Sequence, residues 1–176
     1  MVEDSSANGS LTSAGASGRA NVLLVCSTGG HLLQLVALRG AWEDFSRVWV
    51  TFDKTDARSL LAGERVVFAH GPTNRNFGLL AVRNLLWNLV GAVRLLRVVR
   101  PRVVLTTGAG VAVPFAWIGR LFGARVVYVE SLTRIESPSL SCRLISPVAS
   151  RIYAQWPELT EAVRRARYLG SVVSGS

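Results

Sequence analysis

The amino-acid sequence predicts an α/β domain in which a parallel sheet carries helices on both faces. Short aliphatic segments alternate with helical patterns along the chain, which is typical of βαβ units. Glycine-rich turns follow two of these aliphatic segments. The chain has 176 residues, of which 49% are hydrophobic, so it is long and apolar enough for one domain with its own core.

The amino terminus differs from the rest. Residues 1–20 are rich in Ser, Ala and Gly and lack the basic start and apolar centre of a signal peptide, so we expect a disordered polar tail. Residues 21–176 then form the single domain. No uninterrupted run of about 18 apolar residues follows, and we therefore predict no transmembrane helix.

The first elements follow from apolar runs and the residues that end them. A buried strand is predicted at 21–26, and a helix at 31–39 begins directly after two glycines. Aliphatic and aromatic runs predict strands at 47–52 and 64–70. The Gly, Pro and Asn residues of 71–76 predict a loop.

The middle of the chain contains the longest helical pattern. It runs over residues 77–99 and is stopped by Pro101. A strand at 102–108, a helix at 111–122 and a strand at 124–130 continue the alternation.

The last elements are shorter. A helix is predicted at 140–149, with a break at Pro147, followed by a strand at 151–155. A helix at 157–165 begins with proline, which is tolerated in the first turn. The segment 166–173 is a possible last strand.

The charge indicates an anionic partner. The formal net charge is +9, and Lys54 is the only lysine, so the basic character comes from arginine. Nucleic acid, an acidic membrane surface and a phosphorylated substrate are all candidates. Nucleic acid is the least favoured, because the arginines are interleaved with aliphatic residues rather than with aromatic stacking platforms.

The cysteines and histidines give no metal-binding spacing. Cys26 and Cys142 are interpreted as reduced thiols of a cytosolic protein. His31 and His70 are far apart in the sequence, and no cluster of ligands includes them. We expect no metal and no cofactor.

Two glycine-rich loops follow predicted strands and form the candidate phosphate-binding site. Ligands of parallel α/β sheets bind beyond the carboxyl ends of the strands, and a helix that begins there directs free N–H groups at an anion. Tight turns without a ligand are the alternative. The candidate residues are Ser27, Thr28, Gly29 and Gly30 in the first loop and Thr107, Gly108 and Gly110 in the second.

A dinucleotide site is a weaker alternative. The pattern G-x-G-x-x-G is absent, although Asp53 stands at the end of the second strand, where a ribose-binding acid would lie.

The third candidate loop begins at Glu130, which ends an apolar strand. Its carboxylate could accept a proton or sugar hydroxyls, or could brace the loop. Ser131 and Arg134 follow it as candidate acceptor-binding residues, although Arg134 could instead pair with Glu136.

His31 is the candidate general base. It lies in the first turn of a predicted helix, and an unperturbed imidazole pKa near 6.5 suits proton removal from an attacking hydroxyl. A neutral histidine bonded to the backbone is the alternative.

The long helix has two kinds of surface. At 100° per residue, an apolar arc lies opposite a basic one that surrounds a tryptophan. The helix could be an ordinary half-buried one, or it could lie on an anionic membrane, with Phe77 and its neighbours at the start dipping deeper. The apolar arc contains Val82, Leu85, Leu86, Leu89, Val93 and Leu96, and the basic arc contains Arg83, Trp87, Arg94 and Arg97.

Three stretches together resemble a known family. STGGHLLQL, TTGAGVAVPFA and above all YVESLTRIESPSLSCRLISPVASRIYAQWPEL are similar to the asparagine-linked glycosylation protein fourteen family and its bacterial PssD-type relatives. The likeness covers about residues 21–173, and MurG-type transferases also look similar in their glycine-rich loop.

The resemblance implies a half-enzyme. It implies a Rossmann-like domain similar to the amino-terminal, acceptor-binding half of a GT-B glycosyltransferase, with the donor-binding carboxyl half on a separate chain. The implied reaction transfers N-acetylglucosamine or another hexose from a UDP-sugar to a polyprenyl-diphosphate-linked acceptor. Lipid-linked oligosaccharide, capsule or exopolysaccharide biosynthesis would use such a step.

The tail departs from the eukaryotic members, which carry a hydrophobic anchor. A polar tail favours a bacterial protein bound peripherally to the cytoplasmic face of the membrane. A non-catalytic membrane scaffold and a stand-alone dinucleotide-binding protein remain the alternatives.

Overall fold

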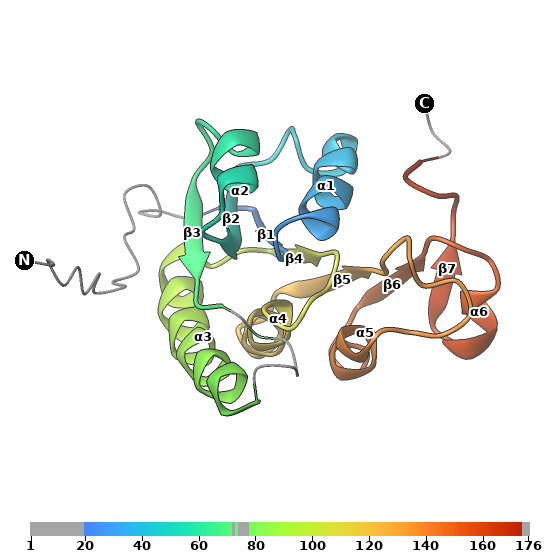
Figure 1. The fold of residues 1–176 in the computed structure, drawn as a ribbon. Helices are drawn as coiled ribbons and strands as arrows, with labels where there is room; N and C mark the ends of the chain where they lie inside the picture. The colour runs from blue at the N-terminus through green and yellow to red at the C-terminus, as the bar shows by residue number, and fades with distance from the viewer. Residues whose placement is uncertain (1–19, 72, 74–77, 174–176) are drawn as a thin grey trace, which may run out of the picture.

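The computed structural model describes residues 20–71, 73 and 78–173. Figure 1 shows one central sheet with helices packed against it. The predicted tail lies outside the described residues except for Ala20, which is buried and donates its N–H to the Val99 carbonyl at 3.1 Å. Phe77 also lies outside the described residues.

The predicted parallel sheet is confirmed. Within the described residues seven strands lie in the order β3-β2-β1-β4-β5-β6-β7, and every neighbouring pair is parallel. The strand order reverses between β1 and β4, so the loops after these two strands open a crevice at one point of the rim. The strands are β1 (Val22–Val25), β2 (Arg47–Phe52), β3 (Val66–Ala69), β4 (Val103–Thr106), β5 (Arg125–Val129), β6 (Arg151–Ala154) and β7 (Ala166–Tyr168).

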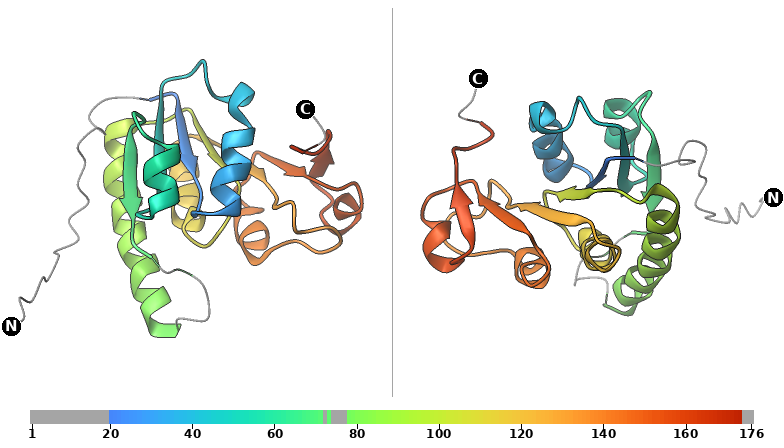
Figure 2. Two further views of the ribbon diagram at one scale, coloured as in Figure 1. Left: turned by 45° about the horizontal axis from the view of Figure 1, so that its top comes forward. Right: turned by 180° about the vertical axis from the view of Figure 1, so that it is seen from behind.

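Helices lie on both faces, as predicted, but they cover them unequally. In the part of the chain that the structure describes, two helices and a 3-10 turn lie on one face, and four helices lie on the other (Figures 1 and 2). The first group is α1 (Gly30–Ala37), η1 (Arg39–Ala41) and α2 (Thr55–Leu60), and the second is α3 (Gly78–Val99), α4 (Ala112–Leu121), α5 (Leu140–Ile145) and α6 (Leu159–Ala162). The short α2 was not predicted.

Each face of the sheet has its own core. The core under α3–α6 contains Val104, Val126 and Ile152, which are fully or almost fully buried. The core under α1 and α2 contains Leu24 and Trp49. On this second face the side chains of β4–β6 are less well covered, because no described helix lies over β5 and β6 (Figure 1).

The long helix α3 turns a different face to the sheet from the one its aliphatic periodicity indicates. Of the predicted apolar arc only Leu96 is buried, while Leu86 is 58% exposed and Leu79, about two helical turns before it, is 89% exposed. The aliphatic arc is therefore not the face by which α3 packs against the sheet, except at Leu96. The buried residues are Ala81, Asn84, Asn88, Gly91, Ala92, Leu96 and Val99.

The physical reason lies in the end of β3. The Asn88 side chain accepts from the His70 N–H and donates to the His70 carbonyl, both at 2.8 Å. A buried amide is needed there because the backbone of His70 would otherwise lack these partners. Small residues on the same face let α3 approach closely, and the aliphatic side chains are left outside.

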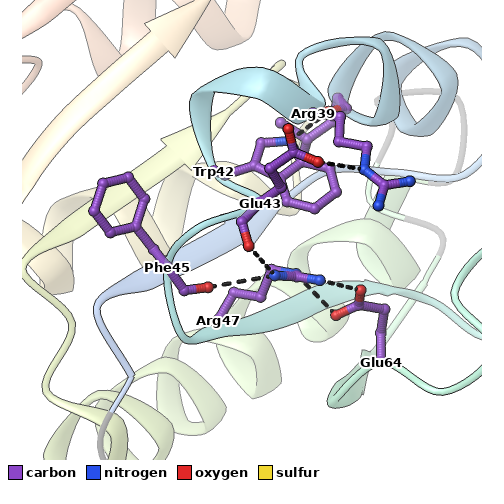
Figure 3. Close-up of polar contacts among 7 residues, drawn as sticks. Arg39, Trp42, Glu43, Phe45, Arg47 and Glu64 are labelled. Atoms are coloured by element: carbon purple, nitrogen blue, oxygen red, sulfur yellow. Dashed lines mark hydrogen bonds and ion pairs between the residues drawn. The ribbon is translucent and has the colours of Figure 1, made fainter.

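The turn between α1 and β2 is held by the interactions in Figure 3. The Arg47 guanidinium donates two hydrogen bonds to Glu64, at 2.6 and 3.0 Å, and lies over the Trp42 ring at 4.9 Å. Trp42 packs edge-on against Trp49. Together these contacts fix η1 and Phe45 beside the open half of the sheet.

Candidate functional site

The loops after β1 and β4 lie against one another at the point where the strand order reverses. The Thr107 hydroxyl donates to the His31 carbonyl at 2.7 Å, and His31 Nδ1 lies 2.8 Å from the Thr107 carbonyl oxygen. Two loops that are 76 residues apart in the sequence therefore form one rim. This brings together the first two groups of predicted site residues.

The contact with Thr107 fixes the tautomer of His31. A carbonyl oxygen can only accept, so Nδ1 must carry the proton and donate it. In the neutral ring Nε2 then holds a lone pair, and it makes no hydrogen bond among the described residues. Burial lowers the pKa of the imidazole, against the smaller opposing effects of the Thr107 bond and Glu130. His31 is thus neutral at pH 7, with Nε2 free to accept a proton.

The first glycine loop already holds a carboxylate. Asp56, in the first turn of α2, accepts the Gly29 N–H at 2.7 Å, while Gly29 has a φ of +72° that favours glycine. One N–H that was predicted to face a bound anion is therefore occupied by a side chain. Asp56 gave no signal in the sequence, because its partner lies 27 residues away.

The second glycine loop is closely packed. Gly108 has a φ of +102°, and a Cβ placed there would lie 2.8 Å from the Tyr128 hydroxyl. A Cβ at Gly110 would lie 2.8 Å from the Thr73 carbonyl. Both positions require glycine, and Ala109 between them also has a positive φ, of 72°. The loop is thus a fixed structure at the start of α4.

The Glu130 carboxylate points into the protein. It is fully buried, and Oε1 accepts from the Ser131 N–H at 2.8 Å and the Tyr128 hydroxyl at 3.1 Å. Oε2 accepts from the Ser139 N–H at 2.9 Å. Three donors on a buried carboxylate are the surroundings of a loop-bracing acid, which was the alternative to a catalytic base.

A group of hydroxyls extends this brace. Tyr128 also contacts the Ser139 and Ser141 hydroxyls at 3.0 and 3.2 Å, and Ser139 caps α5 by accepting from the Cys142 N–H. Burial, followed by the charge of Glu130, raises the pKa of the Tyr128 phenol. The stretch from β5 to α5 is therefore one hydrogen-bonded unit, which accounts for its many serines.

The remaining residues of the third loop lie at the surface. The Ser131 hydroxyl contacts that of Thr133 at 3.0 Å, and the Ser131 carbonyl accepts the Arg134 N–H. Arg134 is exposed and forms no ion pair with Glu136 or any other described residue. Its guanidinium is available to an anion.

Gln34 is a site-supporting residue that the sequence analysis missed. It is buried in α1, donates to the Glu130 carbonyl at 2.7 Å and accepts from the Leu132 N–H at 3.4 Å. It therefore ties the helix that carries His31 to the loop that begins at Glu130. A polar residue within the apolar run HLLQL was the available signal.

The other candidate reactive residues are ion-paired or buried. Asp53 is paired with Arg58 at 2.6 Å, and this bond lowers the pKa of its carboxyl, so it gives no support to the ribose-binding alternative. Cys26 and Cys142 are buried and free, and burial raises the pKa of each thiol to about 12. Among the described residues no group of three His, Cys, Asp or Glu side chains could hold a metal ion.

The fold and this rim define a class of protein. The structure matches Acinetobacter baumannii MurG with a TM-score of 0.68 at 18% identity, over 84% of this chain and 45% of that one. The domain is therefore Rossmann-like and of the kind found as the amino-terminal half of GT-B proteins. The chain matches less than half the length of MurG.

The family follows from the sequence match. The family model described as "Oligosaccharide biosynthesis protein Alg14 like" matches residues 22–172, so the chain belongs to the Alg14-like family. The resemblance stated above is thereby confirmed.

Curated relatives are named as subunits of a transferase. The "UDP-N-acetylglucosamine transferase subunit ALG14" of Debaryomyces hansenii is 26% identical over 87% of this chain and 76% of its own length. That of Eremothecium gossypii is 44% identical over 42% of this chain and 35% of its own length.

Proposed function

We propose that this chain is the acceptor-binding, membrane-associating subunit of a two-component glycosyltransferase. The donor would be a UDP-sugar, and the acceptor a sugar on a polyprenyl diphosphate. The names of the relatives favour N-acetylglucosamine as the transferred sugar. The observation that carries the proposal is the free Nε2 of a neutral His31 at the crevice between the loops after β1 and β4.

The geometry supports a specific division of roles. An acceptor hydroxyl beside His31 would attack the anomeric carbon of the donor sugar, Nε2 would take the hydroxyl proton, and UDP would leave with the electron pair of the broken bond. Burial disfavours the charge formed on the ring, and the Thr107 carbonyl, which accepts from Nδ1, and the charge of Glu130 offset part of that cost. Glu130, in this proposal, positions the loop and does not touch the acceptor.

The acceptor diphosphate is assigned to the second and third loops. Arg134 is exposed and unpaired among the described residues, and the loop Thr107–Gly110 lies at the rim that also carries His31. The first loop, Ser27–Gly30, would contact the acceptor sugar, because Asp56 already occupies the Gly29 N–H.

The membrane-facing surface is the outer side of α3. Its first three turns expose aliphatic side chains, and the exposed Arg83, Trp87 and Arg94 lie beside them. This combination is typical of helices that lie in the membrane interface. Among the described residues α3 is also the one helix with the length and hydropathy of a membrane span. Because its end packs into the core, we propose peripheral attachment at the cytoplasmic face. The bacterial origin stays a prediction.

The purified chain alone is expected to transfer no sugar. It forms one α/β domain, whereas the MurG match covers less than half of that protein. Adding the donor-binding carboxyl-half protein encoded in the same genome should restore turnover, measured as labelled sugar passed to a polyprenyl-diphosphate acceptor. Robust transfer by the chain alone would contradict the half-enzyme proposal.

Vesicle binding is expected to depend on the arginines of α3. Each arginine near an anionic surface contributes about 1 kcal/mol, so replacing Arg83, Arg94 and Arg97 by glutamine should weaken binding about a hundredfold. Co-sedimentation with anionic vesicles at low and high salt measures this. The matched control replaces Arg125, Arg151 and Arg167, which lie on outer strands of the sheet and change the net charge equally. Equal losses in both triple variants would show that α3 has no special role.

A further inference from the structure

Asp56 is a charged side chain at the rim of the sheet that uses only one of its two oxygens. It lies in the first turn of α2 and is half-buried. Oδ2 accepts the Gly29 N–H at 2.7 Å, while Oδ1 makes no hydrogen bond among the described residues. No ion pair joins Asp56 to a cation in the described part of the chain. One oxygen of an unpaired carboxylate can therefore accept from a ligand.

The hydrogen bond to Gly29 places this charge close to His31. Consecutive Cα atoms lie about 3.8 Å apart, so the Cα atoms of Gly29 and His31 are at most about 7.6 Å from one another. The contacts with Thr107 hold His31 at the crevice. The Asp56 carboxylate and the candidate base therefore belong to one short stretch of the rim.

The backbone between these two groups borders open space. A Cβ placed on Gly29 or Gly30 would meet no described atom within 4 Å. Gly29 needs glycine for its positive φ, but Gly30 has no positive φ, so neither its conformation nor its packing requires glycine. Glycine in a helix is also less favourable than alanine. The missing side chain at Gly30 leaves room for a ligand to approach the backbone beside His31.

The charge of Asp56 determines which chemical group fits this space. A carboxylate oxygen only accepts hydrogen bonds, so Oδ1 pairs with a donor such as a sugar hydroxyl. The diphosphate of a lipid-linked sugar has no proton to donate, and its negative charge is repelled by the carboxylate. Arg134, in the third loop, offers the opposite charge from an exposed position. The first loop is therefore suited to a neutral sugar and the third loop to an anion.

A purely structural role explains less of this geometry. To hold the Gly29 N–H, the side chain at position 56 has to supply an acceptor oxygen, but it does not have to be charged. An asparagine carbonyl would make the same hydrogen bond. The negative charge and the unused Oδ1 are the two properties that a brace leaves unexplained.

We infer that Asp56 is a specificity-determining residue, which accepts a hydroxyl of the acceptor sugar through Oδ1 and keeps phosphate groups out of the first loop. The inference rests on the proposed function, because that function supplies the sugar and the diphosphate. It sets the direction of the bound acceptor, with the sugar at Gly29 and Gly30 and the diphosphate toward Arg134.

The first test uses the full chain alone, with inorganic pyrophosphate as the probe and calorimetry as the measurement. Asp56→Asn keeps an acceptor for the Gly29 N–H and removes the charge, so pyrophosphate should bind at least about tenfold more tightly. Asp44→Asn is the matched control, because Asp44 is exposed, has no ion pair among the described residues and precedes β2, whereas Asp56 follows it. The control should keep the wild-type Kd. Thermal unfolding of both variants is measured in parallel.

The second test uses the reconstituted pair and measures the KM for the lipid-linked acceptor. Asp56→Asn should raise this KM at least about threefold, because a hydrogen bond to a charged acceptor is roughly twice as strong as a neutral one. Asp56→Ala, which removes both oxygens, should raise it at least about tenfold. In both variants the effect on kcat should be much smaller than the effect on KM.

The other outcomes decide against the inference. Wild-type behaviour of Asp56→Asn in both tests would show that Asp56 is only a brace, even if Asp56→Ala is impaired. Equal tightening of pyrophosphate binding in Asp44→Asn would assign that effect to net charge. A loss of kcat at unchanged KM would place Asp56 in the chemical step. Each of these results leaves the proposed function intact. If the reconstituted pair transfers no sugar, the proposed function fails, and the assignment of a sugar to Asp56 fails with it.

Discussion

His31→Ala is expected to lower kcat of the reconstituted pair by about a hundredfold to ten-thousandfold, the usual contribution of a general base. The structure refines this experiment, because His31 has two functions that separate by atom. Nδ1 donates a hydrogen bond to the Thr107 carbonyl, and Nε2 has no hydrogen-bond partner among the described residues. Turnover is measured with saturating donor and acceptor, and partner binding is measured alongside.

His31→Asn is the matched control. An asparagine amide can reach the Thr107 carbonyl from the place of Nδ1, but it has no equivalent of the basic Nε2. If His31 acts as the base, the Asn and Ala variants lose kcat alike. If His31 only braces the two loops, the Asn variant keeps most of its turnover, and the assignment of the base is wrong.

The same residue sets an expected pH dependence. Because burial lowers the pKa of His31 below 6.5, kcat/KM should fall only on the acid side of that value, and this limb should be absent in His31→Asn. The stability of the fold should change with pH in the same direction. Below about pH 6.5 the unfolded chain binds a proton that the folded chain resists, so the free energy of unfolding falls as the pH is lowered through this window.

Glu130→Gln is expected to lower stability by about 1–3 kcal/mol. The substituted amide turns an N–H₂ toward a donor that the carboxylate satisfied, and an unsatisfied buried group costs about this much. In a domain of this size the loss corresponds to a melting temperature lower by roughly 3–10 °C. Thermal unfolding of the chain alone measures it.

Activity then separates a brace from a base. Turnover per folded molecule should fall much less in Glu130→Gln than in His31→Ala. Glu136→Gln, at an exposed position in the same loop, is the control and should change neither property. An unchanged melting temperature combined with abolished turnover would make Glu130 the better candidate base.

The sequence predicted the sheet well because its strands are locally encoded. Runs such as those around Leu24, Val104 and Val127 are continuously apolar and bounded by glycine, proline or polar residues, which is sufficient for parallel strands. The rim followed from topology, since loops after neighbouring parallel strands must meet. The six-residue helix α2 escaped because it is too short to show a period and buries only Ala57.

What could not be predicted depends on contacts between distant segments. The Asp56 carboxylate bonds to Gly29, 27 positions away, and the Gln34 amide bonds to Glu130, 96 positions away. Nothing in the local sequence indicates either pair. The buried face of α3 could not be predicted for a related reason. Periodicity finds the aliphatic face of a helix, but here the buried face is chosen by the backbone of His70, which requires Asn88.

The small-residue face of α3 also makes local unfolding uneven along this helix. Its first turns bury Ala81 and Asn84, which remove little apolar area from water, while its last turns bury Leu96 and Val99 in the core. The free energy of opening therefore rises from the amino-terminal to the carboxyl-terminal end. The first turns can fray while the sheet stays intact. On the proposed membrane surface, this part of α3 could therefore change its depth and tilt without disturbing the His31–Thr107 contact.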